Sequence, residues 1–152
     1  MEKRKMKEID ELGRSDRGAY ILEFRIDDAI SINVGRLGRI RLEAGWHYYV
    51  GSAMGGLRGR ILRHVVGGGK RHWHVDYLRE KTKPLRVWWV VTRRRVEGEV
   101  AGIVRRKCKP SVKGFGCSDR RESGTHLFYS RRRRIFAEET RELGRVGKWN
   151  GR

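Results

Sequence analysis

The stretch of residues 46–65 most constrains what this chain can fold into, because its pattern changes from strand to helix around a glycine turn. Four of its first five residues are aromatic or β-branched, which favours a strand. Gly51, Gly55 and Gly56 then permit a tight turn that residues with a Cβ resist. After the turn, apolar residues recur at helical spacing on one face: Leu57, Ile61 and Val65.

Two basic residues of this predicted helix, Arg60 and His64, are four positions apart and therefore share a face directed toward the end of the strand. The glycine turn leads into the helix N-terminus, where free backbone N–H groups and the helix dipole favour a phosphate group. Taken alone, the stretch is equally compatible with an ordinary strand–turn–helix that carries basic surface residues.

A second strand is predicted upstream, from Gly18 to about residue 26, because apolar residues alternate there on one face. Three short motifs then follow in order on the first strand, the second strand and the helix: Gly18-x-Tyr20, Tyr49-x-Gly51 and Arg60-x-x-x-His64. Together they resemble the GIY-YIG nuclease superfamily, and within it a small archaeal and bacterial branch long labelled a domain of unknown function. Further segments similar to that branch stand at residues 51–57, 72–78, 114–119 and 126–129.

The resemblance implies an α/β (α+β) fold with a small, mostly antiparallel central sheet flanked by helices. It also implies a divalent-metal-dependent endonuclease that uses one Mg²⁺ or Mn²⁺ ion. In such a site Tyr20 and Tyr49 would position water and phosphate, Arg60 would contact the scissile phosphate, and His64 would assist. The same branch occurs fused to endonuclease III-type proteins, which implies DNA ahead of RNA as substrate and a repair protein as partner. Without this pattern, each tyrosine would be interpreted as a core aromatic residue.

A carboxylate for the metal is expected on the helix predicted over residues 96–107. Glu99 lies three residues after Val96 and four before Ile103, so its carboxylate is expected on the inward, apolar side, where it needs a cation. The resemblance assigns metal binding to Glu99. Glu97 is the alternative, because an acidic residue in the first helical turn often only offsets the helix dipole.

Residues 67–71 form a glycine-rich basic loop, for which phosphate contacts are expected. His72 and Asp76 follow at i and i+4 in a helix predicted over residues 72–81, where they could hold a metal or orient an imidazole. We favour a structural hydrogen bond between them over a metal site. Around these elements we predict seven nucleic-acid contacts: Ser52, Arg58, Arg63, Lys70, Arg71, His72 and His74.

The charge of the chain points to a polyanionic partner. Thirty-seven Lys and Arg against 18 Asp and Glu give a formal net charge of +19, which favours nucleic acid. A membrane partner is not expected, because no long apolar run, signal-peptide core or amphipathic basic helix occurs, and we expect a cytoplasmic location. Glutamine is absent and asparagine occurs only twice, which suggests a thermophilic source.

One domain is expected from the length of 152 residues, with a core over about residues 16–130 and basic extensions at residues 1–15 and 131–152. The N-terminal extension would be a short helix laid on the core or a frayed lead-in. Residues 131–134 are all arginine; they would begin a C-terminal helix that contacts the nucleic-acid backbone, or an arm that folds on it.

Three further strands are predicted inside that core, together with one at its end. Residues 30–34 and 39–42 alternate like a short hairpin between the motif strands, and residues 84–91 are the most β-prone run, expected near the centre of the sheet. Residues 126–129 are expected at an edge of the sheet. The two cysteines of the chain are expected as free thiols, and we reject a zinc site because the available ligands form an incomplete set: Cys108, Cys117 and His126.

These observations predict a metal-dependent, endonuclease-like protein that hydrolyses phosphodiester bonds in nucleic acid. A nucleic-acid-binding module that keeps the same scaffold without efficient cleavage is the main alternative. A basic structural protein of a ribonucleoprotein particle is a third.

Overall fold

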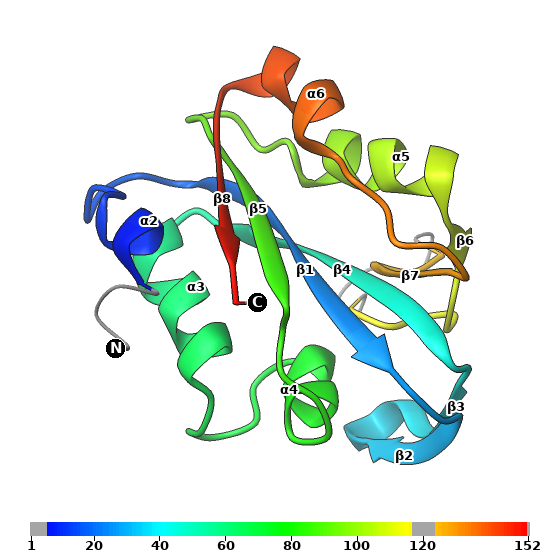
Figure 1. Cartoon of the computed structure of the whole chain (residues 1–152). Helices are drawn as coiled ribbons and strands as arrows, with labels where there is room; N and C mark the ends of the chain where they lie inside the picture. Colours follow the sequence, from blue (N-terminus) through cyan, green and yellow to red (C-terminus); the bar gives the residue numbers. More distant parts are fainter. Residues whose placement is uncertain (1–5, 117–123, 152) are drawn as a thin grey trace.

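A six-stranded antiparallel sheet forms the centre of the protein, as the computed structural model in Figure 1 shows. The structure describes residues 6–116 and 124–151. The strand order is β6-β7-β4-β1-β5-β8. The strands are β1 (Gly18–Ile26), β4 (Gly45–Ala53), β5 (Arg86–Val91), β6 (Lys109–Pro110), β7 (Leu127–Ser130) and β8 (Arg145–Asn150). The predicted fold class, a mostly antiparallel sheet flanked by helices, is confirmed.

Helices cover both faces of this sheet (Figure 1). They are α2 (Lys7–Asp10), α3 (Leu57–Val66), α4 (His74–Arg79), α5 (Glu97–Lys107) and α6 (Ala137–Thr140), with 3₁₀ turns η1 (Gly35–Leu37) and η2 (Arg141–Leu143). None of the helices in the described part of the chain has both the length and the apolar run needed to cross a membrane.

The alternation of side chains along β1 creates two separate apolar layers. Tyr20 and Leu22 join one layer together with residues of α2, α3 and α4, and we call this side of the sheet the α3 face. Ala19 and Ile21 join the other layer with residues of α5 and the segment after β7, and we call this side the α5 face. The candidate site residues Tyr20 and Tyr49 both lie on the α3 face.

Gly18 and Gly51, the two glycines of the strand motifs, stand where neighbouring atoms lie too close to leave room for a Cβ. In the register of β1 with β4, Gly51 lies opposite Tyr20, and a Cβ on Gly51 would come within 2.4 Å of the Tyr20 ring and hydroxyl. Gly18 has a φ of +154°, and a Cβ there would come within 1.8 Å of the Val90 carbonyl oxygen on β5. Because no side chain fits at either place, the two glycines set how closely β1 approaches its neighbours.

The hairpin predicted between the motif strands is present as β2 (Ile30–Val34) and β3 (Gly38–Leu42). These strands pair only with each other, as a separate two-stranded sheet, within the described residues. β1 and β4 are therefore direct neighbours in the main sheet, as the motif requires. The strand predicted over residues 84–91 is β5, which pairs with β1 on one side and β8 on the other.

One buried carboxylate joins three strands on the α5 face. Glu23 of β1 is fully buried and accepts hydrogen bonds from Arg86 Nε at 2.9 Å, Arg133 Nη2 at 2.9 Å and the Tyr48 hydroxyl at 3.0 Å. Arg86 Nη2 also donates to the Arg134 carbonyl oxygen at 2.9 Å. The segment after β7 is thus tied to the centre of the sheet through β1, β4 and β5.

The C-terminal segment differs most from expectation. The sequence predicts residues 131–152 as a basic extension with one helix, but only α6 and η2 are helical and β8 then joins the sheet beside β5. Trp149 of β8 is buried on the α3 face, and Gly147 leaves room for the Trp89 indole, which an added Cβ would meet at 2.3 Å. The strand has few apolar residues because it lies at the sheet edge, and its pattern is therefore weak.

The prediction for the strand at the opposite edge of the sheet is also wrong. Residues 126–129 are expected from the sequence as an edge strand; β7 instead pairs with β4 on one side and with the two-residue β6 on the other. Pro110 of β6 fits this outermost position because it has no N–H to donate. The N-terminal interpretation as a short helix on the core agrees with α2, whose Ile9 is buried.

We expect Gly51→Ala to lower the free energy of unfolding by about 1–3 kcal/mol, because the added methyl group must displace the Tyr20 ring. Gly59→Ala is the matched control, since Gly59 is exposed within α3 and an added Cβ there has no neighbour within 4 Å. The control should raise stability by up to about 1 kcal/mol through helix propensity. Urea unfolding measures both, and a Gly51→Ala protein as stable as the wild type would contradict the steric explanation.

Candidate active site

Tyr20 and His64 form the centre of the candidate site. The Tyr20 hydroxyl and His64 Nε2 are hydrogen bonded at 3.0 Å, and both side chains are buried. His64 reaches the strand because Leu57, Ile61 and Val65 pack α3 onto the sheet with their apolar side. The Tyr49 ring lies 6.4 Å from the Tyr20 ring between centroids. Three of the predicted site residues, from two strands and one helix, are therefore together.

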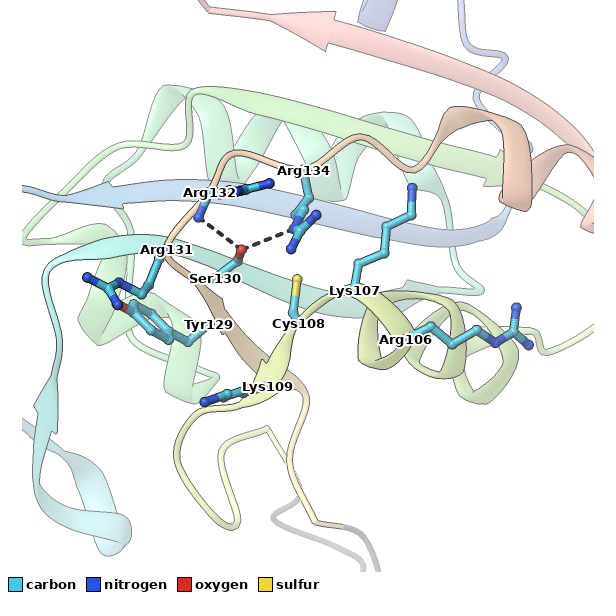
Figure 2. A pocket seen from close by; sticks show the side chains of 9 residues that line it. All are labelled: Arg106, Lys107, Cys108, Lys109, Tyr129, Ser130, Arg131, Arg132 and Arg134. Carbon is cyan, nitrogen blue, oxygen red and sulfur yellow. Dashed lines mark hydrogen bonds between the residues drawn. The ribbon is translucent and has the colours of Figure 1, made fainter.

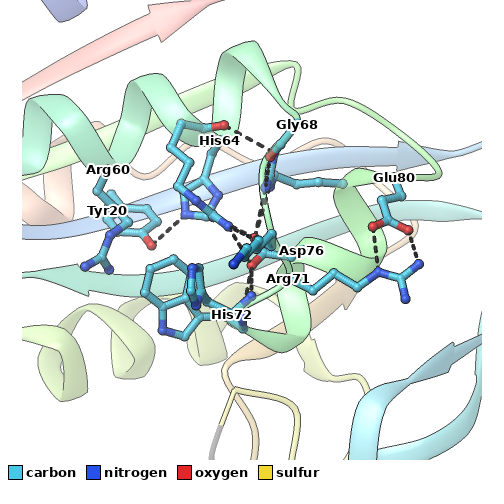
Figure 3. A network of polar contacts seen from close by, with 12 residues as sticks. Tyr20, Arg60, His64, Gly68, Arg71, His72, Asp76 and Glu80 are labelled. Carbon is cyan, nitrogen blue, oxygen red and sulfur yellow. Dashed lines mark hydrogen bonds and ion pairs between the residues drawn. The ribbon is translucent and has the colours of Figure 1, made fainter.

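Arg60 is one helical turn before His64 and lies on the same side of α3 (Figure 3). Its Nη1 donates to the Ser52 carbonyl oxygen at the end of β4, at 2.9 Å. Its guanidinium carbon stands 4.2 Å from the centre of the Trp73 ring, a cation–π contact. Within the described residues no carboxylate pairs with Arg60, so its positive charge is available to an anion. Trp73 is not among the site residues that the sequence predicts.

Burial fixes the protonation of the two tyrosines, and the nearby charges modify it. Burial raises the pKa of Tyr20 to about 12; the Arg60 charge opposes this shift, and the Glu97 and Asp76 charges add to it. Burial also raises the pKa of Tyr49 well above its ordinary value, and the Glu97 charge again adds to the rise. Both phenols are therefore protonated at neutral pH. Glu97 contributes to both shifts, and burial is the larger cause of each.

Glu97 and Glu99 border opposite sides of the apolar stripe of α5. The prediction that Glu99 faces inward is wrong: its side chain is half exposed and pairs with Arg94 at 3.3 Å. Glu97, the alternative, is the first residue of α5, and its Oε2 lies 3.8 Å from His126 Nδ1. Periodicity could not separate them, because each lies at one border of the stripe. The metal-binding role that the resemblance gives Glu99 stays a prediction, although the described contacts do not join Glu99 to the tyrosines.

Asp76 organises the start of α4 (Figure 3). Its carboxylate accepts hydrogen bonds from Arg63 at 2.8 and 3.0 Å and from Arg79 at 3.0 and 3.2 Å. It also accepts the backbone N–H groups of His72 at 2.7 Å and Trp73 at 3.0 Å. Burial would raise the pKa of Asp76, but these donors hold it well below the ordinary value. His72 and Asp76 do share a structural hydrogen bond, but through the His72 backbone N–H. Because α4 begins at His74, the predicted helix over residues 72–81 starts two residues too early, and the expected i, i+4 pair of helical side chains is not formed.

The seven residues predicted to contact nucleic acid differ in whether their side chains are already bonded to other groups of the protein. Arg63 is held by Asp76, and Arg71 by Glu80 through two hydrogen bonds of 2.6 Å. His74 Nδ1 accepts the backbone N–H of Gly116 at 2.8 Å. The remaining members have no close acidic partner among the described residues, Arg58 having only a 3.8 Å contact to Asp10: Ser52, Arg58, Lys70 and His72. Binding by any of the seven stays a prediction.

A single divalent cation fits the chemistry of this site. Residues 6–116 and 124–151 contain no group of three or more His, Cys, Asp or Glu side chains arranged to hold a metal. Mg²⁺, however, is often held by one or two carboxylates, with water and substrate phosphate as its other ligands. The partly exposed carboxylate of Glu97, beside the buried and unpartnered Nδ1 of His126, suits such an arrangement. Cys108 is a buried free thiol, and Cys117 lies outside the described residues.

Comparison with known proteins identifies one family. Residues 19–147 match the family described as domain of unknown function DUF123. No curated protein and no solved structure matches the chain. The family match covers β1, β4, α3 and α5, and so every element of the candidate site.

We expect the buried His64 to make folding sensitive to acid. Burial and the nearby Arg79 lower the pKa of His64 to about 3, against about 6.5 in the unfolded chain. The unfolded state therefore binds one more proton between these values, and the free energy of unfolding falls as pH drops from about 6.5 toward 3, by up to about 1.4 kcal/mol per pH unit.

Denaturant unfolding across this pH range tests the effect. His64→Gln keeps a polar side chain near Tyr20 but cannot titrate, so its stability should fall less steeply with acid than that of the wild type. His72→Gln, which changes an exposed imidazole, should keep the wild-type slope. Equal slopes for wild type and His64→Gln would show that His64 does not resist protonation.

Proposed function

This chain belongs to the family described as domain of unknown function DUF123, and we propose that it is a divalent-metal-dependent endonuclease of the GIY-YIG type. The observation that carries the proposal is the convergence of Tyr20, Arg60 and His64, which come from separate elements and meet beside Tyr49. Motif residues 44 positions apart in sequence share a hydrogen bond, and an unpaired arginine stands next to them. The net charge of +19 supports nucleic acid as the substrate.

Arg60 is the proposed phosphate-binding residue. Its Nη1 is committed to the Ser52 carbonyl, and Trp73 supports the guanidinium plane, so the remaining N–H groups can donate to two oxygens of one phosphate. A fixed cation at this position would offset the charge that develops on phosphate during hydrolysis. The orientation is set before substrate arrives, because Asp76 anchors the backbone of Trp73.

Tyr20 is the proposed positioning group for water or phosphate oxygen. His64 Nδ1 is buried without a hydrogen-bond partner. A buried acceptor without a partner costs less than a buried N–H without one, so the proton belongs on His64 Nε2, which then donates to the Tyr20 oxygen. The Tyr20 hydroxyl hydrogen is left free to point toward substrate. With a pKa of about 12, Tyr20 acts as a neutral, oriented donor at neutral pH.

Glu97 is the proposed metal-binding residue in place of Glu99. A bound Mg²⁺ or Mn²⁺ supplies Lewis acidity and a more acidic water, which the protein residues do not provide. The Glu97 carboxylate acts on both tyrosines and lies beside His126, whereas the Glu99 carboxylate pairs with Arg94. We also propose DNA ahead of RNA as the substrate, and a DNA-repair protein as a partner. Both of these points rest only on the family resemblance.

We expect Glu97→Gln to reduce metal-dependent cleavage by on the order of 100-fold or more, since it removes the proposed metal ligand. Binding of nucleic acid should persist or tighten, because the substitution removes a negative charge near phosphate. Glu99→Gln is the matched control at a half-exposed position of the same helix and should cleave like the wild type. Single-turnover cleavage of branched, single-stranded and duplex substrates, with Mg²⁺ or Mn²⁺, measures the effect.

Calorimetric titration with Mn²⁺ separates the roles of the two glutamates. The wild type and Glu99→Gln should each bind one ion, and Glu97→Gln should bind none. If Glu99→Gln alone lost both cleavage and ion binding, the metal ligand would be Glu99 and not Glu97. Tight nucleic-acid binding by a wild-type protein that cleaves none of the substrates would favour the binding module.

A further inference from the structure

A basic cavity lies away from the candidate active site, between the end of α5 and the segment after β7 (Figure 2). Its volume is about 400 Å³. No Asp or Glu is among its lining residues, and six of them are cationic: Arg106, Lys107, Lys109, Arg131, Arg132 and Arg134.

The charge of this cavity is largely uncompensated. Among the described residues, only Lys107 of the six cations has an acidic partner, Glu139 at 2.5 Å. Arg133 does not line the cavity, because its guanidinium is turned to the buried Glu23. The arginine run at residues 131–134 therefore divides into one residue that holds the fold and three that face the cavity.

The cavity walls are fixed by hydrogen bonds (Figure 2). Ser130 Oγ accepts the Arg132 backbone N–H at 3.1 Å and Arg134 Nε at 3.2 Å. The Arg134 backbone N–H donates to the Tyr48 hydroxyl at 2.7 Å, which connects this segment to the Glu23 cluster. Like charges are thus held near one another by the fold, an arrangement that an anion would stabilise.

This cavity and the candidate active site lie on opposite faces of the sheet. Ser130 is paired with Trp46, and Cys108 in the cavity wall belongs to the apolar layer of the α5 face. Tyr20 and Tyr49 belong to the layer of the α3 face.

We propose that this cavity is a second phosphate-binding site, which holds phosphate groups of a nucleic-acid strand on the α5 face. Guanidinium and ammonium groups on two walls match the oxygens of a phosphodiester or of a terminal phosphate. The site requires no cleavage, so it stands independently of the proposed hydrolytic activity.

The test compares two double variants that each remove two exposed cations. Arg106→Gln with Arg132→Gln removes one cation from each wall of the cavity, and neither side chain forms an ion pair with a described residue. Arg36→Gln with Arg39→Gln is the control, because both lie exposed on the β2–β3 hairpin and have no described acidic partner. Thermal unfolding verifies that each variant keeps the wild-type fold.

Inorganic pyrophosphate is the first probe, measured by calorimetry. The wild type, the hairpin control and Arg60→Gln should share a saturable binding step of equal affinity, and in the cavity variant this step should be at least about tenfold weaker. Single-stranded oligonucleotides with a 5′-phosphate or a 5′-hydroxyl are the second probe. The salt dependence of their binding should become less steep in the cavity variant, by about 0.7 in log–log slope for each phosphate that the variant no longer neutralises. The slope should change less in the control.

The two oligonucleotides identify the source of the phosphate. A preference for the 5′-phosphorylated strand that disappears in the cavity variant assigns the site to a terminal phosphate, and equal weakening of both strands assigns it to internal phosphodiesters. If the two double variants weakened the binding of both probes equally, the cavity would contribute only general positive charge, and the proposal would be overturned. Loss of pyrophosphate binding in Arg60→Gln but not in the cavity variant would also overturn it. All these outcomes are read without cleavage, so a wild type that cleaves nothing leaves the test intact.

Discussion

The buried carboxylate of Glu23 is the interaction on which the arrangement of the sheet and C-terminal segment depends. A charge taken out of water on a central strand is stable only with cations and hydrogen bonds around it. Arg86, Arg133 and Tyr48 supply them, from β5, from the segment after β7 and from β4. Removing any one of these groups would leave buried charge or a buried donor without its partner. The path of the chain after β7 is therefore determined by the centre of the sheet.

Asp76 has the same role on the other side of the protein. It holds Arg63 and Arg79 and fixes the backbone of Trp73, on which Arg60 stacks. In a chain with twice as many cations as anions, the few buried carboxylates decide which arginines are structural. Arg60 and the arginines that line the basic cavity are bound neither by Glu23 and Asp76 nor by another carboxylate of the described residues, so they remain available to an external anion. Both proposed phosphate sites consist of such residues, each beside an arginine that a buried carboxylate holds.

Much of the fold could be predicted from the sequence, because it rests on local patterns. The motif strands, α3, α5 and β5 follow from alternation, glycine turns and helical spacing. β8 could not be predicted this way, since an edge strand needs little apolar surface, and its place beside β5 depends on Gly147 leaving room for the Trp89 indole. Edge strands and buried ion clusters are set by partners far away in sequence, which periodicity does not reveal.

The candidate site was predictable in part for the same reason. Tyr20, Tyr49, Arg60 and His64 meet because a strand register and one helical turn bring them together. The choice between Glu97 and Glu99 required the orientation of α5, and the internal pairing of Arg63 and Arg71 required the positions of Asp76 and Glu80. Trp73 had only one sequence signal, its place at the start of the helix after the basic loop.

The residues of the candidate site and its strand motifs are constrained in two ways, some by the space available and others by their chemistry. Gly18 and Gly51 are required by sterics, so they would be needed in a binding module as much as in an enzyme. In the proposed function, chemistry enters through Arg60 and Glu97, whose opposite charges shift the pKa values of the same two tyrosines in opposite directions. Burial is the main reason that both phenols stay protonated, so at neutral pH Tyr20 and Tyr49 can orient a ligand through hydrogen bonds without carrying charge themselves. In the proposed function, the added positive charge that hydrolysis needs therefore comes from a metal held at Glu97, which a simple phosphate clamp would not require.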